Sequence, residues 1–458
     1  MEREPNTAQD EPAKEEVAEE ISKEIKTGNP AKKRRYVHWG LCVIIAVCSF
    51  LGGVLAVNLS LDPEMRALMR IKSAIDTLYY KDIDDSDFYR VLFDAVNGRV
   101  LDEYSWYMTA DEYEENNNAA TGSRSGLGLV FLTRNAENQP QMLITRVCGN
   151  SPAEAAGLTA GEYVVGFGKS QTEITQSVVF NEFFAFLNEY EAEEKFFIKV
   201  RHGETERIVE IYKSEYVENY VFYRTNTTAY RFVGAKATEL TEGGLPLSAL
   251  PADTAYIRLQ QFNGSAATEF DKVMQIFKNE GKKNLVLDLR GNGGGYLDLM
   301  QSIASYFCKD ATAKKPVVAV ADYGDYKEKF KATGNRFYQY FTDESRICIL
   351  ADGDTASASE CLIGCMVDYG ATAFEDICLT AKNGVAKTFG KGIMQTTYPF
   401  PLSGDAIKLT TAQILWPTSN RCIHGRGVLP EDGALTVEKQ EFDDNEIEKA
   451  LQTLFSQK

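Results

Sequence analysis

The stretch NLVLDLRGNGGG at residues 284–295 decides the fold class of this chain. Its first part, up to Arg290, is rich in Leu and Val and is typical of a buried strand, and its second part is a glycine-rich loop. An apolar segment at 297–307 follows and has the length and composition of a helix. A strand, a glycine loop and a helix in this order predict an α/β domain.

The same alternation of strand and helix continues on both sides of this stretch. A strand at 256–259 and a helix at 267–279 precede it, and a strand at 346–350 and an apolar helix at 361–369 follow. We therefore place the α/β domain at 214–440 and a C-terminal helix or tail at 441–458. The chain has no internal repeat at the spacing of solenoid proteins.

A second unit precedes the α/β domain, at residues 122–213. Strands are predicted at 142–147 and 161–168, and helices at 152–157 and 179–187. Ser151 suits an N-cap, Pro152 the first helical position and Gly157 the C-terminal cap. These signals predict a compact mixed unit of short strands and two helices.

Residues 62–121 have a helical pattern, with apolar residues three and four apart from Met65 to Leu78 and again from Phe88 to Val96. We expect a small helical cap here. A polar stretch at 116–125 is interpreted as the connection to the next unit. The fold class is thus α/β (α+β) and multidomain.

The N-terminal end predicts a membrane anchor. Residues 1–35 are rich in Glu, poor in large apolar side chains and end in the basic run KKRR, so we expect a disordered cytoplasmic tail. Residues 36–61 contain an uncharged apolar run long enough to span a bilayer as a helix. The basic run on its N-terminal side predicts that everything after Leu61 faces outward. The alternative is a cleaved signal peptide, with Ala56 at the small-residue position.

Composition excludes some functions. The chain has 458 residues, enough for two or three folded units, and its 49 Lys and Arg against 66 Asp and Glu leave a net charge of −17. This charge argues against a nucleic-acid-binding surface. Seven of the nine cysteines lie outside the predicted anchor, and none has the paired spacing of a zinc site. Cys361 and Cys365 share a predicted helix face, which core packing explains.

The glycine loop has three possible roles. Phosphate binding is disfavoured, because Tyr296 stands where a dinucleotide fingerprint needs glycine and no Gly-Lys-Ser/Thr follows. The loop offers backbone N–H groups at the end of a strand, which is what stabilising an oxyanion requires. A tight structural turn remains the third interpretation.

A hydroxyl-rich junction at 354–360 follows the strand at 346–350 and precedes a helix. Ser357 there is either a helix cap or a nucleophile close to helix N-terminal amides. A nucleophile needs a base, and of the three histidines only His424 is a candidate, since His38 borders the anchor and His202 lies in a strand. Lys391, between two glycines, is the other candidate, because burial lowers the pKa of an amine. The alternative to a catalytic base is an ordinary solvent-exposed lysine of a loop.

Three ordered blocks, at 287–294, 355–360 and 388–395, resemble the signatures of the C-terminal processing (tail-specific) peptidases. The segments 101–108 and 409–432 are also similar to that family. The resemblance covers residues 64–435. It implies an α/β domain of the tail-specific protease type, a serine nucleophile and a lysine base.

The resemblance assigns a role to each matching residue. Ser357 corresponds to the nucleophile, Lys391 to the general base and Gln395 to the residue that supports the lysine; Ala358 and Gly293 would donate the oxyanion hydrogen bonds. Thr355 and Ser359 become packing or capping residues, and His424 a structural residue. Thr355 departs from the usual serine, and extra residues at 380–387 lengthen the stretch before Lys391, so the distance within the dyad is the open point.

The unit at 122–213 resembles a PDZ domain. Such a domain adds a peptide to the edge of its sheet and holds the terminal carboxylate with amides of a glycine loop. Gly126, Leu127, Gly128 and Leu129 match that loop. An ordinary hairpin turn is the alternative.

Together with the predicted anchor, these resemblances imply a membrane-anchored serine endopeptidase that captures protein C-terminal tails and cleaves them through an acyl-enzyme. No metal or organic cofactor is expected, the partners are protein or peptide tails and the membrane, and a homo-oligomer is compatible with the sequence. Two alternatives are a catalytically silent scaffold that binds partner tails and, less favoured, phosphate binding by the glycine loop.

Overall fold

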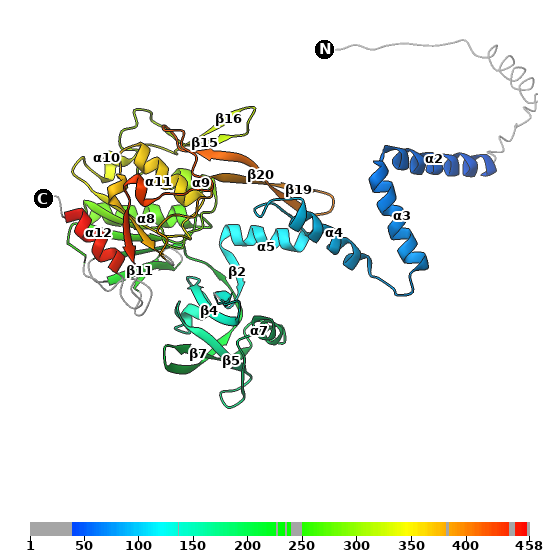
Figure 1. Cartoon of the computed structure of the whole chain (residues 1–458), viewed down its shortest axis with the longest axis horizontal. Helices are drawn as coiled ribbons and strands as arrows, with labels where there is room; N and C mark the ends of the chain where they lie inside the picture. The colour runs from blue at the N-terminus through cyan, green and yellow to red at the C-terminus, as the bar shows by residue number, and fades with distance from the viewer. Residues whose placement is uncertain are drawn as a thin grey trace, which may run out of the picture. The chain divides into compact units, whose positions relative to one another are not determined.

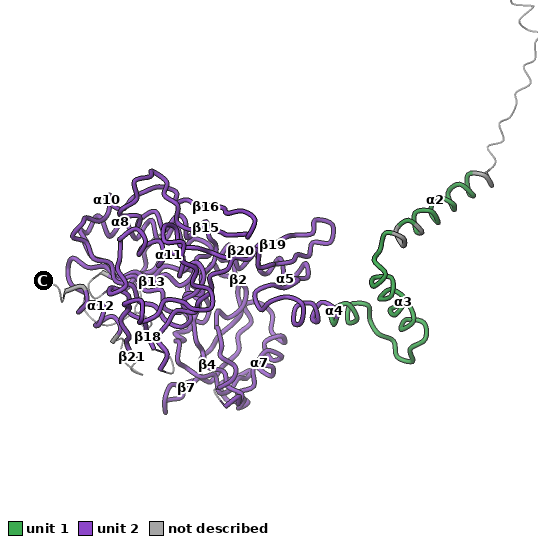
Figure 2. The backbone as a smooth tube through the Cα atoms, turned by 45° about the horizontal axis from the view of Figure 1, so that its top comes forward, with its two compact units in different colours: residues 1–91 green, residues 92–458 purple. Residues whose placement is uncertain are grey.

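The computed structural model describes residues 39–135, 137–225, 228–233, 236–239, 250–381, 384–438 and 445–455. The chain divides into two compact units, residues 1–91 and 92–458 (Figure 2). The predicted tail at 1–35 and the first residues of the predicted anchor lie outside the described residues.

The first unit is helical. Helix α2 (Trp39–Ser60) contains no Asp, Glu, Lys or Arg and exposes large apolar side chains from Val43 to Val54. Helix α3 (Pro63–Leu78) and the start of α4 (Asp85–Arg99) follow, as the apolar spacing predicts. Within the described residues, no helix is both long and apolar enough to cross a membrane.

The second unit contains an eight-stranded sheet in the order β12-β11-β10-β13-β14-β17-β18-β21. The last five strands in this order, from β13 to β21, are parallel to one another. The first three, β12, β11 and β10, are added antiparallel at one edge. The strands are β10 (Val221–Thr225), β11 (Thr228–Val233), β12 (Lys236–Glu239), β13 (Thr254–Leu259), β14 (Asn284–Asp288), β17 (Ile347–Ala351), β18 (Ile377–Ala381) and β21 (Leu435–Glu438).

Helices cover both faces of this sheet, as parallel strands require (Figure 1). Leu285 and Leu287 of β14 join a large core with helices α8 (Ala266–Asn279), α9 (Leu297–Ala304) and α11 (Ala358–Asp368). Val286 between them points to the other face, where helix α12 (Asn445–Phe455) packs. Successive side chains of a strand point to opposite faces, and both faces of β14 are buried. This is why its sequence is a nearly continuous apolar run. The α/β class is confirmed.

The second unit also contains a five-stranded antiparallel sheet. Its long central strand, β20, pairs with β1, β15 and β19, and β16 completes the edge. The strands are β1 (Trp106–Met108), β15 (Val317–Asp322), β16 (Lys327–Lys331), β19 (Ile393–Pro399) and β20 (Ala406–Leu415). Because β1 pairs with β20, residues just after α4 are tied to a strand about 300 positions later.

Residues 129–212 form a separate six-stranded sheet, here called the six-stranded domain, in the order β3-β4-β5-β7-β8 with β6 on β5. Its elements are β3 (Leu129–Arg134), β4 (Pro140–Val147), α6 (Pro152–Ala155), β5 (Tyr163–Gly168), β6 (Ile174–Gln176), α7 (Phe180–Leu187), β7 (Lys195–His202) and β8 (Thr205–Tyr212). Ser151 caps α6 by accepting from Glu154 N, and Gly157 has φ 69°, as predicted.

Two sequence predictions need correction. The polar stretch at 116–125 is not a linker: helix α5 (Ala110–Thr121) runs through its first half, and β2 (Ser123–Gly126) pairs with β9 (Ser214–Val217) in the second. A capping box between Thr109 and Glu112 starts α5, which explains how so polar a segment forms a helix. The helix predicted at 297–307 ends at Ala304.

Candidate active site

Ser357 lies between strand β17 and helix α11, directly before the first residue of the helix. Its backbone has φ 58° and ψ −117°, a region that non-glycine residues rarely adopt. Such strain persists only where the surroundings impose it, and it is typical of functional sites. The side chain is partly exposed on a junction whose neighbours are buried.

The glycine loop packs directly against Ser357. A Cβ added to Gly294 would lie 2.8 Å from Ser357 Cβ and 2.9 Å from Ala358 N, so only glycine fits. Asn292 O accepts from Ala356 N and from Ser359 Oγ, each at 2.9 Å. The two motifs are thus joined by hydrogen bonds as well as by contact.

Two backbone N–H groups remain available beside Ser357. Among the described residues, neither Gly293 N nor Ala358 N donates to another group of the chain. By contrast, Gly294 N donates to Asn292 Oδ1 at 2.9 Å and Gly291 N to Asp352 Oδ1 at 3.0 Å. Gly293 N and Ala358 N are the pair that the family resemblance implied as oxyanion donors, and Ala358 N is also at a helix N-terminus.

Glu360, on the first turn of α11, links the serine to the lysine. Its fully buried carboxylate accepts from Ser357 N at 3.0 Å and from Lys391 N at 2.9 Å, both on Oε2. Oε1 accepts from Gly390 N at 2.9 Å and Thr388 Oγ1 at 2.5 Å. Burial raises the pKa of Glu360, and these hydrogen bonds oppose that rise. No role for Glu360 was predicted from the sequence.

The loop that carries Lys391 is clamped by the segment at 424–428. A Cβ on Gly390 would lie 2.9 Å from Gly427 N, and one on Gly392 2.6 Å from His424 N. Gly425 N also donates to Gly390 O at 2.8 Å. The glycines on either side of the lysine therefore allow this close passage, as the sequence indicated. His424 is exposed and contributes its backbone here.

The Lys391 amine lies over the ring of Tyr104, with Nζ 4.7 Å from the ring centroid. Burial lowers the pKa of Lys391, while the nearby carboxylates of Asp102 and Glu103 raise it. Among the described residues no hydrogen bond joins Lys391 Nζ to Ser357 Oγ. The structure therefore brings the two residues together through their backbones and Glu360, with the amine turned towards Tyr104.

Gln395 is on strand β19, and its side-chain amide donates to Thr410 Oγ1 of β20 at 3.2 Å. Thr410 in turn bonds Ser105, since Thr410 N donates to Ser105 Oγ at 2.8 Å. Gln395 is thus linked through Thr410 to Ser105, the residue after Tyr104, and among the described residues it has no hydrogen bond to the lysine amine. Of the lengthened stretch before Lys391, residues 382–383 lie outside the described part of the chain.

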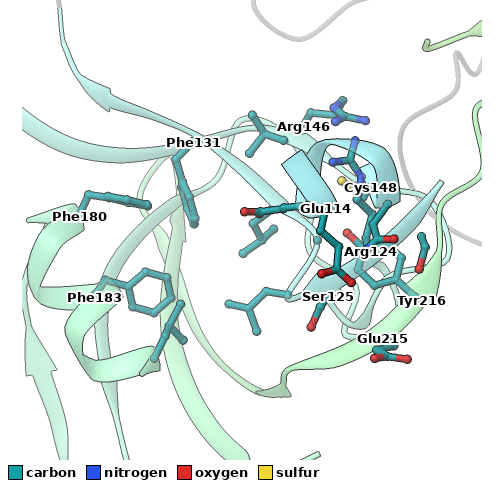
Figure 3. A pocket seen from close by; sticks show the side chains of 18 of the residues that line it. Glu114, Arg124, Ser125, Phe131, Arg146, Cys148, Phe180, Phe183, Glu215 and Tyr216 are labelled. Atoms are coloured by element: carbon teal, nitrogen blue, oxygen red, sulfur yellow. The ribbon is translucent and has the colours of Figure 1, made fainter. Parts of the chain in front are cut away.

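The six-stranded domain borders a groove of about 580 Å³ between strand β3 and helix α7 (Figure 3). Three of the four residues predicted to hold a terminal carboxylate, Leu127, Gly128 and Leu129, line it; Gly126 does not. Gly128 has φ 82°, and a Cβ there would lie 2.1 Å from Ser151 Cβ, so this turn requires glycine. β3 is an edge strand of its sheet, open to a further strand.

Comparison with known proteins then gives the family. The model of peptidase family S41 matches residues 253–432. Because of this match, residues 253–432 are called the S41 domain. It contains the glycine loop, Ser357, Glu360 and Lys391, and the predicted resemblance to C-terminal processing peptidases is confirmed.

The similarity to known proteins extends beyond the S41 domain. A probable CtpA-like serine protease of Staphylococcus saprophyticus is 26% identical over 432 residues, covering 91% of this chain and 77% of that protein. A protein of the same description from Staphylococcus epidermidis is 26% identical, covering 81% of this chain and 66% of the relative. The chain is therefore related to serine peptidases outside the S41 domain as well as within it.

Solved structures are similar at lower identity. The photosystem II D1 C-terminal processing protease matches with a TM-score of 0.46 at 18% identity, over 81% of this chain and 86% of that one. A putative S41 protease from Bacteroides fragilis matches with a TM-score of 0.47 at 14% identity, over 82% of this chain and 91% of that one.

Within the described residues, no group of three or more His, Cys, Asp or Glu side chains is placed to hold a metal ion.

Proposed function

We propose that this chain is a serine endopeptidase in which Ser357 is the nucleophile and Lys391 the general base. Lys391 would accept the proton of Ser357 as its oxygen attacks the substrate carbonyl, and would later activate the water that hydrolyses the acyl-enzyme. Gly293 N and Ala358 N would stabilise the oxyanion. The observation that carries this proposal is the shared carboxylate oxygen of Glu360, which receives the N–H groups of both residues.

In the site as it stands, the lysine amine would have to turn from Tyr104 towards Ser357. Loose contacts of this kind commonly tighten when substrate binds. A lysine has several rotatable bonds, so the movement needs no change in the clamped backbone of Gly390 and Gly392. Gln395 would act through Thr410 and Ser105 on the segment that carries Tyr104.

The six-stranded domain is proposed to act as a PDZ module that captures protein C-terminal tails. The support is an open edge strand, β3, beside helix α7, with the glycine turn of residues 126–129 at the start of that strand. An added peptide strand would gain main-chain hydrogen bonds from the edge and carboxylate binding from the turn.

The anchor is also a proposal. It rests on the sequence: the apolar run within residues 36–61, of which helix α2 is the described part, follows the basic run at 32–35 and would hold the chain in the membrane with the S41 domain on the outer side. The silent scaffold is the competing function, since the lysine amine and the serine hydroxyl are not hydrogen-bonded.

Digestion of an unstructured protein tests the proposed function. The purified chain is expected to cleave it into products that mass spectrometry can map, and amidation of the substrate's C-terminus should slow the cleavage. Tail binding without any cleavage would favour the scaffold. Cleavage indifferent to the amide would retain the peptidase but contradict tail capture.

The pH dependence of kcat/KM should report the amine of Lys391. Because only the neutral amine accepts a proton, the rate should rise with pH through the pKa of Lys391, which burial lowers. Glu103→Gln removes a charge that raises this pKa, so the rising limb should move to lower pH. Asp102→Asn removes the other carboxylate that raises this pKa, so its limb should move in the same direction.

The control for this pair is Glu204→Gln, which removes an exposed charge from a turn of the six-stranded domain. Its profile should coincide with that of the unmodified chain, because solvent screens distant surface charges. If the rising limb of kcat/KM stays at the same pH in both site variants, a group other than Lys391 controls the rate.

A further inference from the structure

The groove of the six-stranded domain has an aromatic wall. Phe131 of β3 faces Phe180 and Phe183 of α7, with ring centroids 5.8 and 6.0 Å from that of Phe131 (Figure 3). Leu187, one turn further along α7, also lines the groove. Such a wall suits an apolar side chain of a bound peptide.

A different wall of the same groove is acidic and comes from outside the domain. Helix α5 contributes Asp111, Glu114, Glu115 and Asn118 to the lining. These positions are three, four and seven apart, which places them on one face of the helix. Three of the four residues carry carboxylates, which form the stripe along α5, and Glu215 of β9 adds a fourth carboxylate to the groove.

These carboxylates are available to a ligand. Within the described part of the chain, neither Glu114 nor Glu115 forms an ion pair, and both are exposed. Asp111 also lies in the first turn of α5, where a negative charge stabilises the helix. Helix stabilisation therefore explains the charge of Asp111 but not the charges of Glu114 and Glu115, which lie beyond the first turn.

The two arginines of the groove do not neutralise the stripe. Arg124 and Arg146 both bind the carboxylate of Glu218, which is completely buried; the Arg124 contact is 3.1 Å. One of their two charges is therefore balanced by Glu218, whereas the α5 stripe and Glu215 contribute four negative charges. The groove as a whole is acidic on one side and aromatic on the other.

We propose that the groove selects protein tails that end in an apolar residue and carry Lys or Arg a few positions upstream. This inference rests on the tail-binding part of the proposed function. In a peptide added to β3, successive side chains point to opposite sides. One set would enter the aromatic wall, and basic side chains of the other set would reach the α5 stripe.

Fluorescence anisotropy with the full-length Ser357→Ala variant tests the selection. The probes are short fluorescein-labelled peptides that share one apolar C-terminal sequence and differ only in two upstream residues, both Lys or both Glu. The Lys probe is expected to bind about tenfold more tightly at low salt, with the difference shrinking as salt rises. An amidated Lys probe measures the contribution of the free C-terminus.

Paired variants locate the effect. Glu114→Gln with Glu115→Gln should remove most of the preference for the Lys probe, and Glu114→Lys with Glu115→Lys should reverse it. Glu173→Gln with Glu204→Gln is the matched control, because it removes the same charge from exposed turns outside the groove. That control should keep the full preference.

The outcomes separate this inference from the proposed function. Equal binding of the two probes, or a preference that both pairs of Gln variants lose alike, would overturn charge selection by α5 while leaving tail capture intact. Failure of both probes to bind the chain would overturn tail capture and, with it, this inference.

Discussion

Ser357→Ala is expected to lower single-turnover cleavage of an unfolded substrate by at least about a thousandfold while leaving tail binding unchanged. The substitution removes the attacking oxygen only. Glu360 is bonded to the backbone N–H of residue 357, so alanine keeps the contact that sets the junction. Unfolding by urea should therefore occur at nearly the same midpoint as in the unmodified chain.

Ser359→Ala is the matched control for this result. The Ser359 hydroxyl is buried and donates to Asn292 O, so its loss should cost about 1 kcal/mol of stability but retain most of the cleavage rate. If Ser357→Ala cleaves as fast as the unmodified chain, Ser357 is not the nucleophile. If Ser359→Ala is instead the inactive variant, the nucleophile was assigned two positions too early.

The lysine can be tested against the serine in the same assay. Lys391→Ala leaves its backbone N–H on Glu360 and should be about as inactive as Ser357→Ala. The double variant should be no slower than either single one, because residues that act as one unit do not contribute additively. Independent, additive losses would place the two residues in different steps.

Much of the S41 domain could be predicted from the sequence, because its signals are local. The apolar run at β14 and the glycines after it predicted a strand and a tight loop, and both are present. The strand-to-helix junction made Ser357 a candidate, either cap or nucleophile, and the family resemblance assigned it the role of nucleophile. The glycines on either side of Lys391 predicted a tight passage of its backbone, which is present, and the resemblance assigned it the role of base.

Contacts between distant segments could not be predicted in this way. The ring of Tyr104 meets the amine of Lys391 only because β1 pairs with β20, a connection of some 300 residues that no local pattern encodes. Likewise, α5 contributes a wall to the groove although its polar sequence suggested a linker. A capping box from Thr109 to Glu112 was the available signal for α5.

Glu360 was missed for a related reason, although a signal for it existed. A glutamate three residues after a serine at a helix start is the pattern of a capping box, and that interpretation suffices for the sequence. In the structure the same carboxylate also accepts from Thr388, Gly390 and Lys391. Glu360, which the sequence presents only as a helix cap, thus joins the segment of Ser357 to that of Lys391.

Glu360→Gln is expected to reduce kcat by about a hundredfold, because misplacing a catalytic group by a small distance has effects of this size. The glutamine amide has one accepting oxygen, so two of the four donors would face an N–H group instead. If the oxygen stays with Thr388 and Gly390, the N–H groups of Ser357 and Lys391 lose their shared partner. Stability should also fall, by about 2 kcal/mol.

Glu269→Gln separates the positioning role of Glu360 from a general loss of stability. Glu269 is likewise buried and accepts four hydrogen bonds, from Asn219, Tyr220, Val221 and Ser265, none of them in the site. Its variant should unfold at a similarly reduced urea concentration but keep the kcat of the folded protein. If both variants lose kcat only in proportion to the unfolded fraction, Glu360 stabilises the fold without positioning the dyad. A loss confined to Glu360→Gln, with KM nearly unchanged, means that the carboxylate sets the distance between nucleophile and base.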